Sequence, residues 1–487
     1  MKLKDLLKNV NYKTFSINED LDITNLSMNS KTVGKNGLFF ALKGNSFNGN
    51  DFIPEAALNG AEVVVSDDEE SANVFAGTVL VKNVRKAINQ IAKNFYGNNY
   101  NFKTIAITGT NGKTSISFML AHALRAAGYD VGVIGTSGAF FNDERLRPEG
   151  LTTPDSLEFF ELMGMFNKLS VEYVIFELSA HALYYDKTLG LKSDYAIFTN
   201  LTEDHLDFFK TMENYGKAKQ KMFTSNYAKM AIINTDDPFG LHLYQKTSLP
   251  VVTYGENMGT CIRLLKTSKD LKYAKIKVYD KVTKLRMREF NGKYNFYNAM
   301  AAIAVLVKEG IKIKTIKKAF ATLPKIKGRQ NVFKIKNHGT VILDFAHTPD
   351  GLEKILTYAK TQTTKKGKLI SVFGCGGNRD ENKRPIMGEI SAKIADFTYI
   401  SIDNPRYEDA SKVMNDVAVG ARKIGNNYKI TMPRTEAIRE AIENSKVGDV
   451  IVVSGKGVEP YYDDHGTKYF YREDREIVKI KKELEKC

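Results

Sequence analysis

The sequence predicts an α/β protein of several domains, in which mostly parallel sheets are covered by helices. Short apolar runs alternate with helical patterns along most of the 487 residues, and this βα alternation is typical of parallel sheets. The length favours about three domains, since one domain usually holds roughly 100–200 residues. A strand, a glycine-containing loop and a helix follow one another at 103–126, in the order that phosphate-binding units use.

Changes in this pattern define three expected domains. Residues 1–98 mix short strands such as "GLFFALKG" with the helix "RKAINQIAKNFYG". Residues 99–330 contain the apolar strands "KTIAIT", "DVGVIG", "VEYVIFEL", "DYAIFTN" and "MAIIN", then alternating polar and apolar positions over 247–290 that predict antiparallel strands. A second βα series fills 331–487, with strands in "TVILDFAH", "KLISVFGCG", "DFTYISID", "YKITM" and "DVIVVSGKG". The polar stretch "PKIKGRQ" before it is the expected hinge.

Composition excludes several classes of protein. The chain has no apolar run of signal-peptide type and none near the ~20 residues of a membrane span. Three scattered cysteines lack metal-ligand spacing and do not suggest a disulfide framework. We therefore expect a soluble, cytoplasmic protein without membrane insertion. The net charge of +15 raises the question of nucleic acid, but no basic helix interleaved with aromatic residues is present, so we expect anionic small substrates and no nucleic acid.

The loop in "ITGTNGKTS" (107–115) has the chemistry of a phosphate site. Gly109 and Gly112 let the backbone approach phosphate oxygens, and the helix that follows offers unpaired N–H groups and a positive dipole end. Lys113 supplies charge for the β- and γ-phosphates, and the Thr114 hydroxyl is a ligand for Mg²⁺. The usual P-loop glycine is replaced by Ile107, which predicts a tighter loop and a specific subclass of nucleotide-binding protein.

Two side chains at the ends of neighbouring strands are candidates for the same site. Glu177 ends the strand "VIFEL", and His205 follows the next strand in "TNLTEDHLD". Ligands of open α/β sheets bind beyond the carboxyl ends of the strands, so both side chains are placed to hold magnesium or to polarise a reacting group. A solvent-facing glutamate and a structural histidine are the alternatives.

Six motifs in order resemble those of the Mur ligase family, over essentially the whole chain: "TGTNGKT", "FELSAH", "NLTEDHLDFF", "YNFYNAMAAIAV", "DFAHTPDGL" and "FGCGGNRDENKRP". The resemblance implies three domains: a small α/β N-terminal domain that binds UDP, a central P-loop-type ATPase domain with a mostly parallel sheet, and a C-terminal Rossmann-like domain that binds an amino acid. It also implies a ligase reaction, in which ATP converts a carboxylate to an acyl phosphate that an amine attacks.

The resemblance assigns ATP and Mg²⁺ to the centre of the molecule. Its catalytic residues are Lys113, Glu177, His205 and Lys219, and its metal ligands are Thr114, Glu177, His205 and Lys219. Lys219 lies in "ENYGKAKQKMF" where family members carry a carbamylated lysine, which would turn a cation into an anion able to hold Mg²⁺; a solvated lysine is the alternative. The implied nucleotide-binding residues are Gly109, Thr110, Asn111, Gly112, Lys113, Thr114, Asn295, Asn298, Arg329 and Asp344.

The substrate residues resemble those of the branch that adds the third residue of the peptidoglycan stem peptide. This branch acts on UDP-N-acetylmuramoyl-L-alanyl-D-glutamate and takes meso-2,6-diaminopimelate or L-lysine. The motif "DNPR" at 403–406 is typical of diaminopimelate enzymes, because an arginine grips a distal carboxylate that lysine lacks. The implied contacts are Ser30, Thr152, Thr153, Ser179, Tyr185 and Lys187 for the UDP-sugar peptide, and Arg379, Asp403, Asn404, Pro405, Arg406, Gly455 and Glu459 for the amino acid.

Departures from the family pattern leave the amino acid open. Tyr185 and Lys187 stand where members often have glutamine and arginine, and Val458 replaces a histidine beside the amino-acid pocket. A thioether analogue such as lanthionine has the same distal groups as diaminopimelate, so the motif does not exclude it. L-lysine addition and a folylpolyglutamate synthase-like ligase are the further alternatives, although the latter lacks a comparable first domain. By resemblance the protein is expected to be a monomer.

Overall fold

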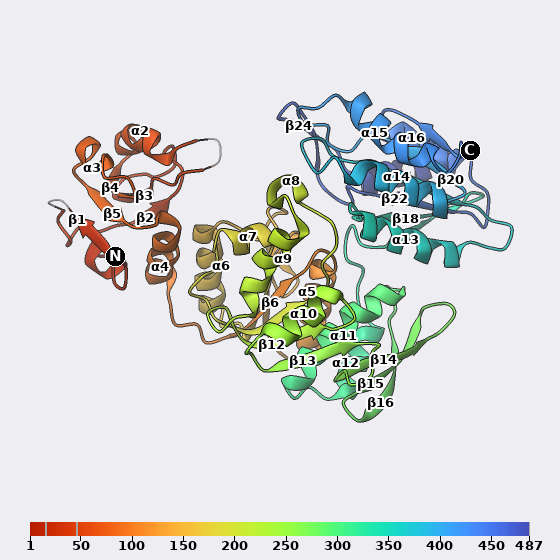
Figure 1. The fold of residues 1–487 in the computed structure, drawn as a ribbon, viewed down its shortest axis with the longest axis horizontal. Helices are drawn as coiled ribbons and strands as arrows, with labels where there is room; N and C mark the ends of the chain where they lie inside the picture. Colours follow the sequence, from red (N-terminus) through yellow and green to blue (C-terminus); the bar gives the residue numbers. More distant parts are fainter. Residues whose placement is uncertain (15–16, 45–46, 487) are drawn as a thin grey trace.

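A computed structural model describes residues 1–14, 17–44 and 47–486 and shows three α/β units in chain order (Figure 1). The first unit holds a five-stranded sheet of order β1-β5-β4-β3-β2, in which β1 alone runs antiparallel within the described residues. Its helices and strands are α1 (Leu3–Leu6), β1 (Tyr12–Thr14), β2 (Asn25–Ser27), β3 (Gly37–Phe40), α2 (Ile53–Leu58), β4 (Ala61–Ser66), α3 (Ser71–Val74), β5 (Thr78–Val81) and α4 (Val84–Tyr96).

The central unit is built on an eleven-stranded sheet of order β16-β15-β14-β13-β12-β11-β6-β10-β7-β8-β9. Its strands are β6 (Lys103–Thr108), β7 (Val131–Gly135), β8 (Gly138–Phe141), β9 (Glu144–Arg147), β10 (Tyr173–Glu177), β11 (Ser193–Phe198), β12 (Ala228–Asn234), β13 (Val251–Gly255), β14 (Ile262–Thr267), β15 (Tyr273–Val278) and β16 (Lys281–Arg286). Its helices are α5 (Lys113–Ala126), α6 (Ser156–Lys168), α7 (Ala180–Tyr184), α8 (Leu206–Phe209), α9 (Met212–Gln220), α10 (Pro238–Lys246), α11 (Lys293–Lys308) and α12 (Ile313–Ala321).

The strand order of the central sheet decides where a ligand can bind. The first strand, β6, lies between β10 and β11 and pairs parallel with both, so the chain order reverses on either side of it. Such a reversal opens a crevice at the carboxyl ends of the strands. The loop after β6 and the residues after β10 and β11 therefore meet at one edge of the sheet.

The prediction of antiparallel strands over 247–290 is confirmed for β14, β15 and β16, and it is wrong for β13. That strand pairs parallel with β12 and with β14. The run Val252–Gly255 is buried on both faces, the environment of a parallel strand. In contrast, β14–β16 bury one face against α11 and α12 and leave the other in solvent.

The third unit contains a six-stranded sheet of order β17-β18-β22-β19-β20-β21, parallel except for β17. All five strands expected in this unit are present, and β17 and a separate hairpin, β23–β24, are additional. The elements are β17 (Asn331–Lys334), β18 (Thr340–Asp344), α13 (Pro349–Gln362), β19 (Leu369–Phe373), α14 (Lys383–Ile394), β20 (Phe397–Ile400), α15 (Ala410–Arg422), β21 (Tyr428–Ile430), α16 (Arg434–Glu443), β22 (Val450–Ser454), β23 (Tyr461–Asp464), β24 (Thr467–Phe470) and α17 (Glu473–Leu484).

Candidate active site

The loop after β6 has the backbone of an anion cradle. Gly109 and Gly112 have positive φ values of 145° and 93°, and Gly112 is the left-handed residue that starts α5. A Cβ on Gly112 would lie 2.5 Å from Asn298 Oδ1, so only glycine fits there. Ile107 is fully buried within β6 and opposite Glu177 of β10. The residue therefore belongs to the strand, and the phosphate loop begins at Gly109.

The carboxylate of Glu177 is buried beside the first turn of α5. It accepts hydrogen bonds from the Thr114 hydroxyl at 3.0 Å and from the Thr136 amide and hydroxyl at 3.2 and 3.1 Å. Burial raises the pKa of Glu177, and Lys113 and Arg329 oppose that rise. Arg329, from the segment 324–330 between the central and third units, donates to the same Thr114 hydroxyl at 3.3 Å. The predicted pair Thr114 and Glu177 is thus brought together as a hydroxyl and a carboxylate that can share a cation.

Two buried lysines converge on the loop. Lys113 Nζ donates to the carbonyls of Gly109 and Thr110, both at 2.9 Å, and Lys219 Nζ donates to the Gly109 carbonyl at 3.0 Å. Burial lowers the pKa of both lysines, and Lys113 depresses that of Lys219 further. Within the described residues Lys219 has no ion pair to a carboxylate, and its ammonium lies 4.5 Å from the Tyr215 ring centroid. A neutral amine, a carbamate or a bound phosphate relieves the cost of such a buried cation.

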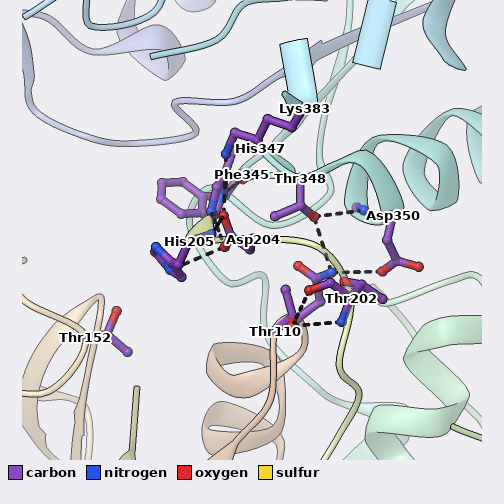
Figure 2. Close-up of polar contacts among 12 residues, drawn as sticks. Thr110, Thr152, Thr202, Asp204, His205, Phe345, His347, Thr348, Asp350 and Lys383 are labelled. Carbon is purple, nitrogen blue, oxygen red and sulfur yellow. Dashed lines mark hydrogen bonds and ion pairs between the residues drawn. The ribbon is translucent and has the colours of Figure 1, made fainter. Parts of the chain in front are cut away.

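His205 lies where the central and third units meet (Figure 2). It has a left-handed φ of 57°, and its ring nitrogen Nε2 lies 3.3 Å from Asp204 Oδ2. Lys383 and His347 of the third unit reach the same Asp204 carboxylate at 3.5 and 3.9 Å. Burial lowers the pKa of His205 to about 3, so its imidazole is neutral and able to act as a ligand. Burial alone would raise the pKa of Asp204, but the positive charges of Lys383 and Lys113 hold it below its usual range.

One cavity of about 320 Å³ joins the phosphate loop to the third unit. It collects most of the predicted site residues, from residues 99–330 (Thr110, Asn111, Gly112, Lys113, Thr114, Thr152, Glu177, Ser179, His205, Lys219 and Arg329) and from the third unit (Arg379, Asp403, Asn404, Arg406, Gly455 and Glu459). Thr153 is buried behind this wall and donates to the Glu177 carbonyl at 2.9 Å. Residues predicted to bind the nucleotide and residues predicted to bind the amino acid thus face one space.

A second cavity, of about 590 Å³, adjoins the same loop and shares Asn111 and Gly112 with the first. Its lining is mostly apolar and includes Tyr294, Tyr297 and Asn298 of α11. Asn298 donates to the Oδ1 of the predicted Asn295 at 3.0 Å. Asp344 lies deeper, where its carboxylate accepts from the backbone N–H groups of Gln330 and Ala346, both at 2.9 Å. The aromatic lining beside a phosphate loop suits a purine base.

The "DNPR" segment surrounds a buried lysine that sequence reasoning missed. Lys456 Nζ is fully buried and lies 2.8 Å from Asn404 Oδ1, 2.9 Å from Glu459 Oε2 and 3.4 Å from Asp403 Oδ1. Asn404 also donates to Glu459 at 2.8 Å. Burial would raise the pKa of Asp403, but Lys456 and nearby arginines keep it below its usual range. The lysine of "SGKGVE" therefore sets the positions of three predicted contact residues.

The position of Arg406 is fixed from two sides. Its Nη1 donates to the Gly377 carbonyl at 2.7 Å, and its backbone, at a left-handed φ of 52°, bonds to the β23–β24 hairpin through Asp463 and His465. Beneath it, Arg384 is fully buried and pairs with Glu408 at 2.8 Å and Asp416 at 2.9 Å. Arg379 lines the cavity beside Arg406. The hairpin and Arg384 had no motif assignment, although Arg384 belongs to the quoted "KRP" run.

The remaining predicted residues lie toward the first unit. Ser30 is buried there and donates to Glu55. Lys187 Nζ lies 2.6 Å from Asp155, and the guanidinium of Arg85, from α4, lies 4.3 Å above the Tyr185 ring. These residues do not line the main cavity, and neither does Pro405. Arg85 adds a cation from the first unit that the sequence patterns did not reveal.

Comparison with known proteins agrees with this geometry. Family models match residues 22–96 (Mur ligase family, catalytic domain), 107–306 (Mur ligase middle domain) and 328–457 (Mur ligase, glutamate ligase domain). The chain is 39% identical to UDP-N-acetylmuramoyl-L-alanyl-D-glutamate--2,6-diaminopimelate ligase 1 of Clostridium acetobutylicum, over 98% of each chain. It is 38% identical to the ligase of the same name from Clostridium tetani, over 98% of this chain and 99% of the relative.

Solved structures show the same architecture. A structure of a UDP-N-acetylmuramoyl-L-alanyl-D-glutamate--2,6-diaminopimelate ligase superimposes with a TM-score of 0.69 and 24% identity, covering 100% of this chain and 99% of the other. No helix within the described residues is long and apolar enough to cross a membrane. On the strength of the matching domains and the full-length relatives, this chain belongs to the Mur ligase family.

Proposed function

We propose that the protein is an ATP-dependent ligase that adds 2,6-diaminopimelate, or a diacid of the same shape such as lanthionine, to UDP-N-acetylmuramoyl-L-alanyl-D-glutamate. Membership of the family and the names of its full-length relatives support the reaction class. The observation that carries the proposal is the single cavity between the phosphate loop and the "DNPR" pocket. In this cavity, a carboxylate activated beside the phosphate loop would meet an amine held in the "DNPR" pocket.

The protein's own part in this reaction is positioning and charge stabilisation. ATP supplies the phosphoryl group that makes the carboxylate reactive. Lys113 and the N–H groups of α5 hold the phosphates, and the aromatic side chains of α11 enclose the base. Thr152 and Ser179, which line the same cavity, orient the peptide carboxylate toward the loop.

The donor set fits magnesium, whose charge would balance that of the phosphates. Thr114 and Glu177 offer a hydroxyl and a carboxylate, and the neutral imidazole of His205 is a further ligand. The described residues contain no group of three or more His, Cys, Asp and Glu side chains that could hold a metal unaided. Phosphate oxygens and a carbamate on Lys219 would complete the set, and the low pKa of Lys219 favours the neutral amine that reacts with carbon dioxide.

The amine substrate is selected at its distal end. Arg406 presents a guanidinium fork to the cavity, beside Arg379, and both suit a second carboxylate. Asp403, Asn404 and Glu459 offer oxygen acceptors to the neighbouring ammonium. Lysine, which lacks the distal carboxylate, would leave the two arginines unpaired. Because both sides of the cavity come from one chain, we propose that the enzyme acts as a monomer.

A phosphate-release assay tests this function. Release from ATP is expected only when both the UDP-muramoyl-dipeptide and a diamino diacid are present, and Arg406→Ala should raise KM for the diacid by roughly 30-fold or more, since a charged pair is lost. KM for ATP should stay unchanged. Arg422→Ala, on an exposed part of α15, is the matched control. Release with folate and glutamate, or equal losses for ATP and diacid, would refute the proposal.

A further inference from the structure

The excess positive charge of the protein is concentrated in one segment. Residues 262–330 contain 19 lysines and arginines and four acidic residues, an excess of 15 that equals the net charge of the whole chain. The remainder of the sequence is therefore balanced. A generally lysine-rich composition would distribute positive charge along the whole chain. Composition alone therefore does not account for the concentration of charge in residues 262–330.

The densest part of this segment is the antiparallel meander β14–β16. Over 262–288 it carries ten basic and two acidic residues, and its inner face packs on α11 and α12. The outer face is left to the cations. Lys266 of β14 lies opposite Lys275 of β15, which lies opposite Lys284 of β16. We name this outer face, with its side chains Arg263, Lys266, Lys275, Lys277, Lys284 and Arg286, the basic face.

The fold itself gains nothing from this arrangement. Like charges directly opposite each other across strands are destabilising. Within the described structure the ten cations make two ion pairs: Lys277 lies 3.8 Å from the fully exposed Asp280, and Arg288 lies 3.5 Å from its neighbour Glu289. The basic face therefore lacks a counter-charge of its own. None of these side chains lines the reaction cavity.

We propose that the basic face docks the enzyme on the surface of an anionic phospholipid bilayer. Phosphate groups of lipid supply the missing negative charge over a broad area. Two exposed apolar side chains accompany the cations, Leu265 and Val282, and suit contact with the interfacial region of a bilayer. In Figure 1, β15 and β16 lie at the end of the central unit that is remote from the first unit. The turn between β14 and β15 approaches the third unit, where Leu271 packs, but none of the basic-face side chains lines either cavity.

Several features favour lipid over nucleic acid as the partner. Seven of the ten cations are lysines, which act as point charges, whereas arginine's fork is the better match for base edges. The aromatic ring on this face, Tyr273, is covered by Lys284 at 4.1 Å and so is not free to stack on a base. The face is a three-stranded sheet with a shallow hollow around Lys266, Tyr273 and Lys284. This broad, shallow shape suits contact with an extended bilayer surface.

Vesicle sedimentation with the full chain tests the proposal. Vesicles of phosphatidylcholine mixed with phosphatidylglycerol should bind the protein, vesicles of phosphatidylcholine alone should not, and added salt should release it. Each lysine near an anionic surface contributes roughly a five-fold gain in partitioning, so Lys266→Gln/Lys275→Gln/Lys284→Gln should weaken binding about 100-fold. Its Tm and ligase activity should not fall, because the substitution removes like-charge repulsion and touches no residue that lines either cavity.

A charge-matched variant separates local docking from net charge. Lys365→Gln/Lys366→Gln/Lys479→Gln removes three exposed lysines of the third unit, none of which makes an ion pair in the described residues. This variant should keep nearly all of the binding. Equal losses for the two triple variants, or no binding of the native protein to anionic vesicles, would overturn the proposal. Tighter binding to a DNA duplex than to anionic vesicles, lost in the first variant alone, would assign the face to nucleic acid instead.

Discussion

Replacing Lys456 by methionine tests whether this buried lysine stabilises the amino-acid pocket. The change keeps the length and apolar stem of a fully buried side chain and removes its charge. Asp403 and Glu459 would then share a buried site without the ammonium that lies 3.4 and 2.9 Å away. Breaking a buried pair by removing one partner costs about 3–5 kcal/mol. Because Arg434 and Arg406 still face Asp403, we expect a loss near the lower limit, about 3 kcal/mol.

Such a loss should lower Tm by roughly 6–12 °C in thermal unfolding, at about 2–4 °C per kcal/mol. It should also raise KM for the diacid, since Asn404 and Glu459 lose their common partner, while KM for ATP is unchanged. The loss should depend on pH. Lys456 helps to hold the pKa of Asp403 below its usual range, so the stabilisation is complete above about pH 4 and disappears as pH falls through the folded pKa.

The deficit of Lys456→Met should therefore be largest at neutral pH and shrink in acid. Lys366→Met, on the surface of the same unit, serves as the control. In a double-mutant cycle, Glu459→Gln should recover part of the loss caused by Lys456→Met, because it removes one of the two unpaired carboxylates. A Tm within about 2 °C of the native value, with the KM for the diacid unchanged, would refute the role given to Lys456.

Three further changes probe the rest of the site. Glu177→Gln should lower kcat by about 100-fold yet keep or raise Tm, because burial raises the pKa of Glu177 and the anion is costly without its ligands; an active variant would contradict this. Intact-protein mass in bicarbonate buffer should show one bound carbon dioxide that is absent from Lys219→Gln; the same mass in both proteins would exclude the carbamate. Arg384→Met should lower Tm and raise KM for the diacid more than that for ATP, since Glu408 loses its buried partner; unchanged unfolding would contradict the role of Arg384.

Much of the fold could be predicted because buried parallel strands appear in the sequence as short, continuous apolar runs. The strands β6, β7, β10, β19 and β22 are of this kind, and each is buried over nearly its whole length. The motifs likewise located Thr114 and Glu177, whose contact depends only on neighbouring strand ends. The position of Ile107 could not be predicted from the loop motif. The motif does not show where β6 ends, and Ile107 lies within that strand.

Other parts could not be predicted because they depend on contacts between distant segments. The role of Lys456 arises from Asn404, which is far away in sequence, and the counter-charge of Lys383 is Asp204 in another unit. The hairpin β23–β24 is short and exposed, so it carries little apolar signal, yet it holds the backbone of Arg406. The basic face became visible only when the pairing register placed Lys266, Lys275 and Lys284 in one row.

The product formed in a mixed-substrate reaction identifies the amino acid that the enzyme selects. The enzyme would be supplied with ATP, the UDP-muramoyl-dipeptide and equal concentrations of meso-diaminopimelate, lanthionine and L-lysine, and the products would be identified by mass spectrometry. If Arg406 and Arg379 bind the distal carboxylate as proposed, the diacid products should account for nearly all of the ligated material, and Arg406→Ala should abolish that preference. If the native enzyme forms mainly the lysine product, the proposal that the third-unit pocket selects a distal carboxylate is wrong.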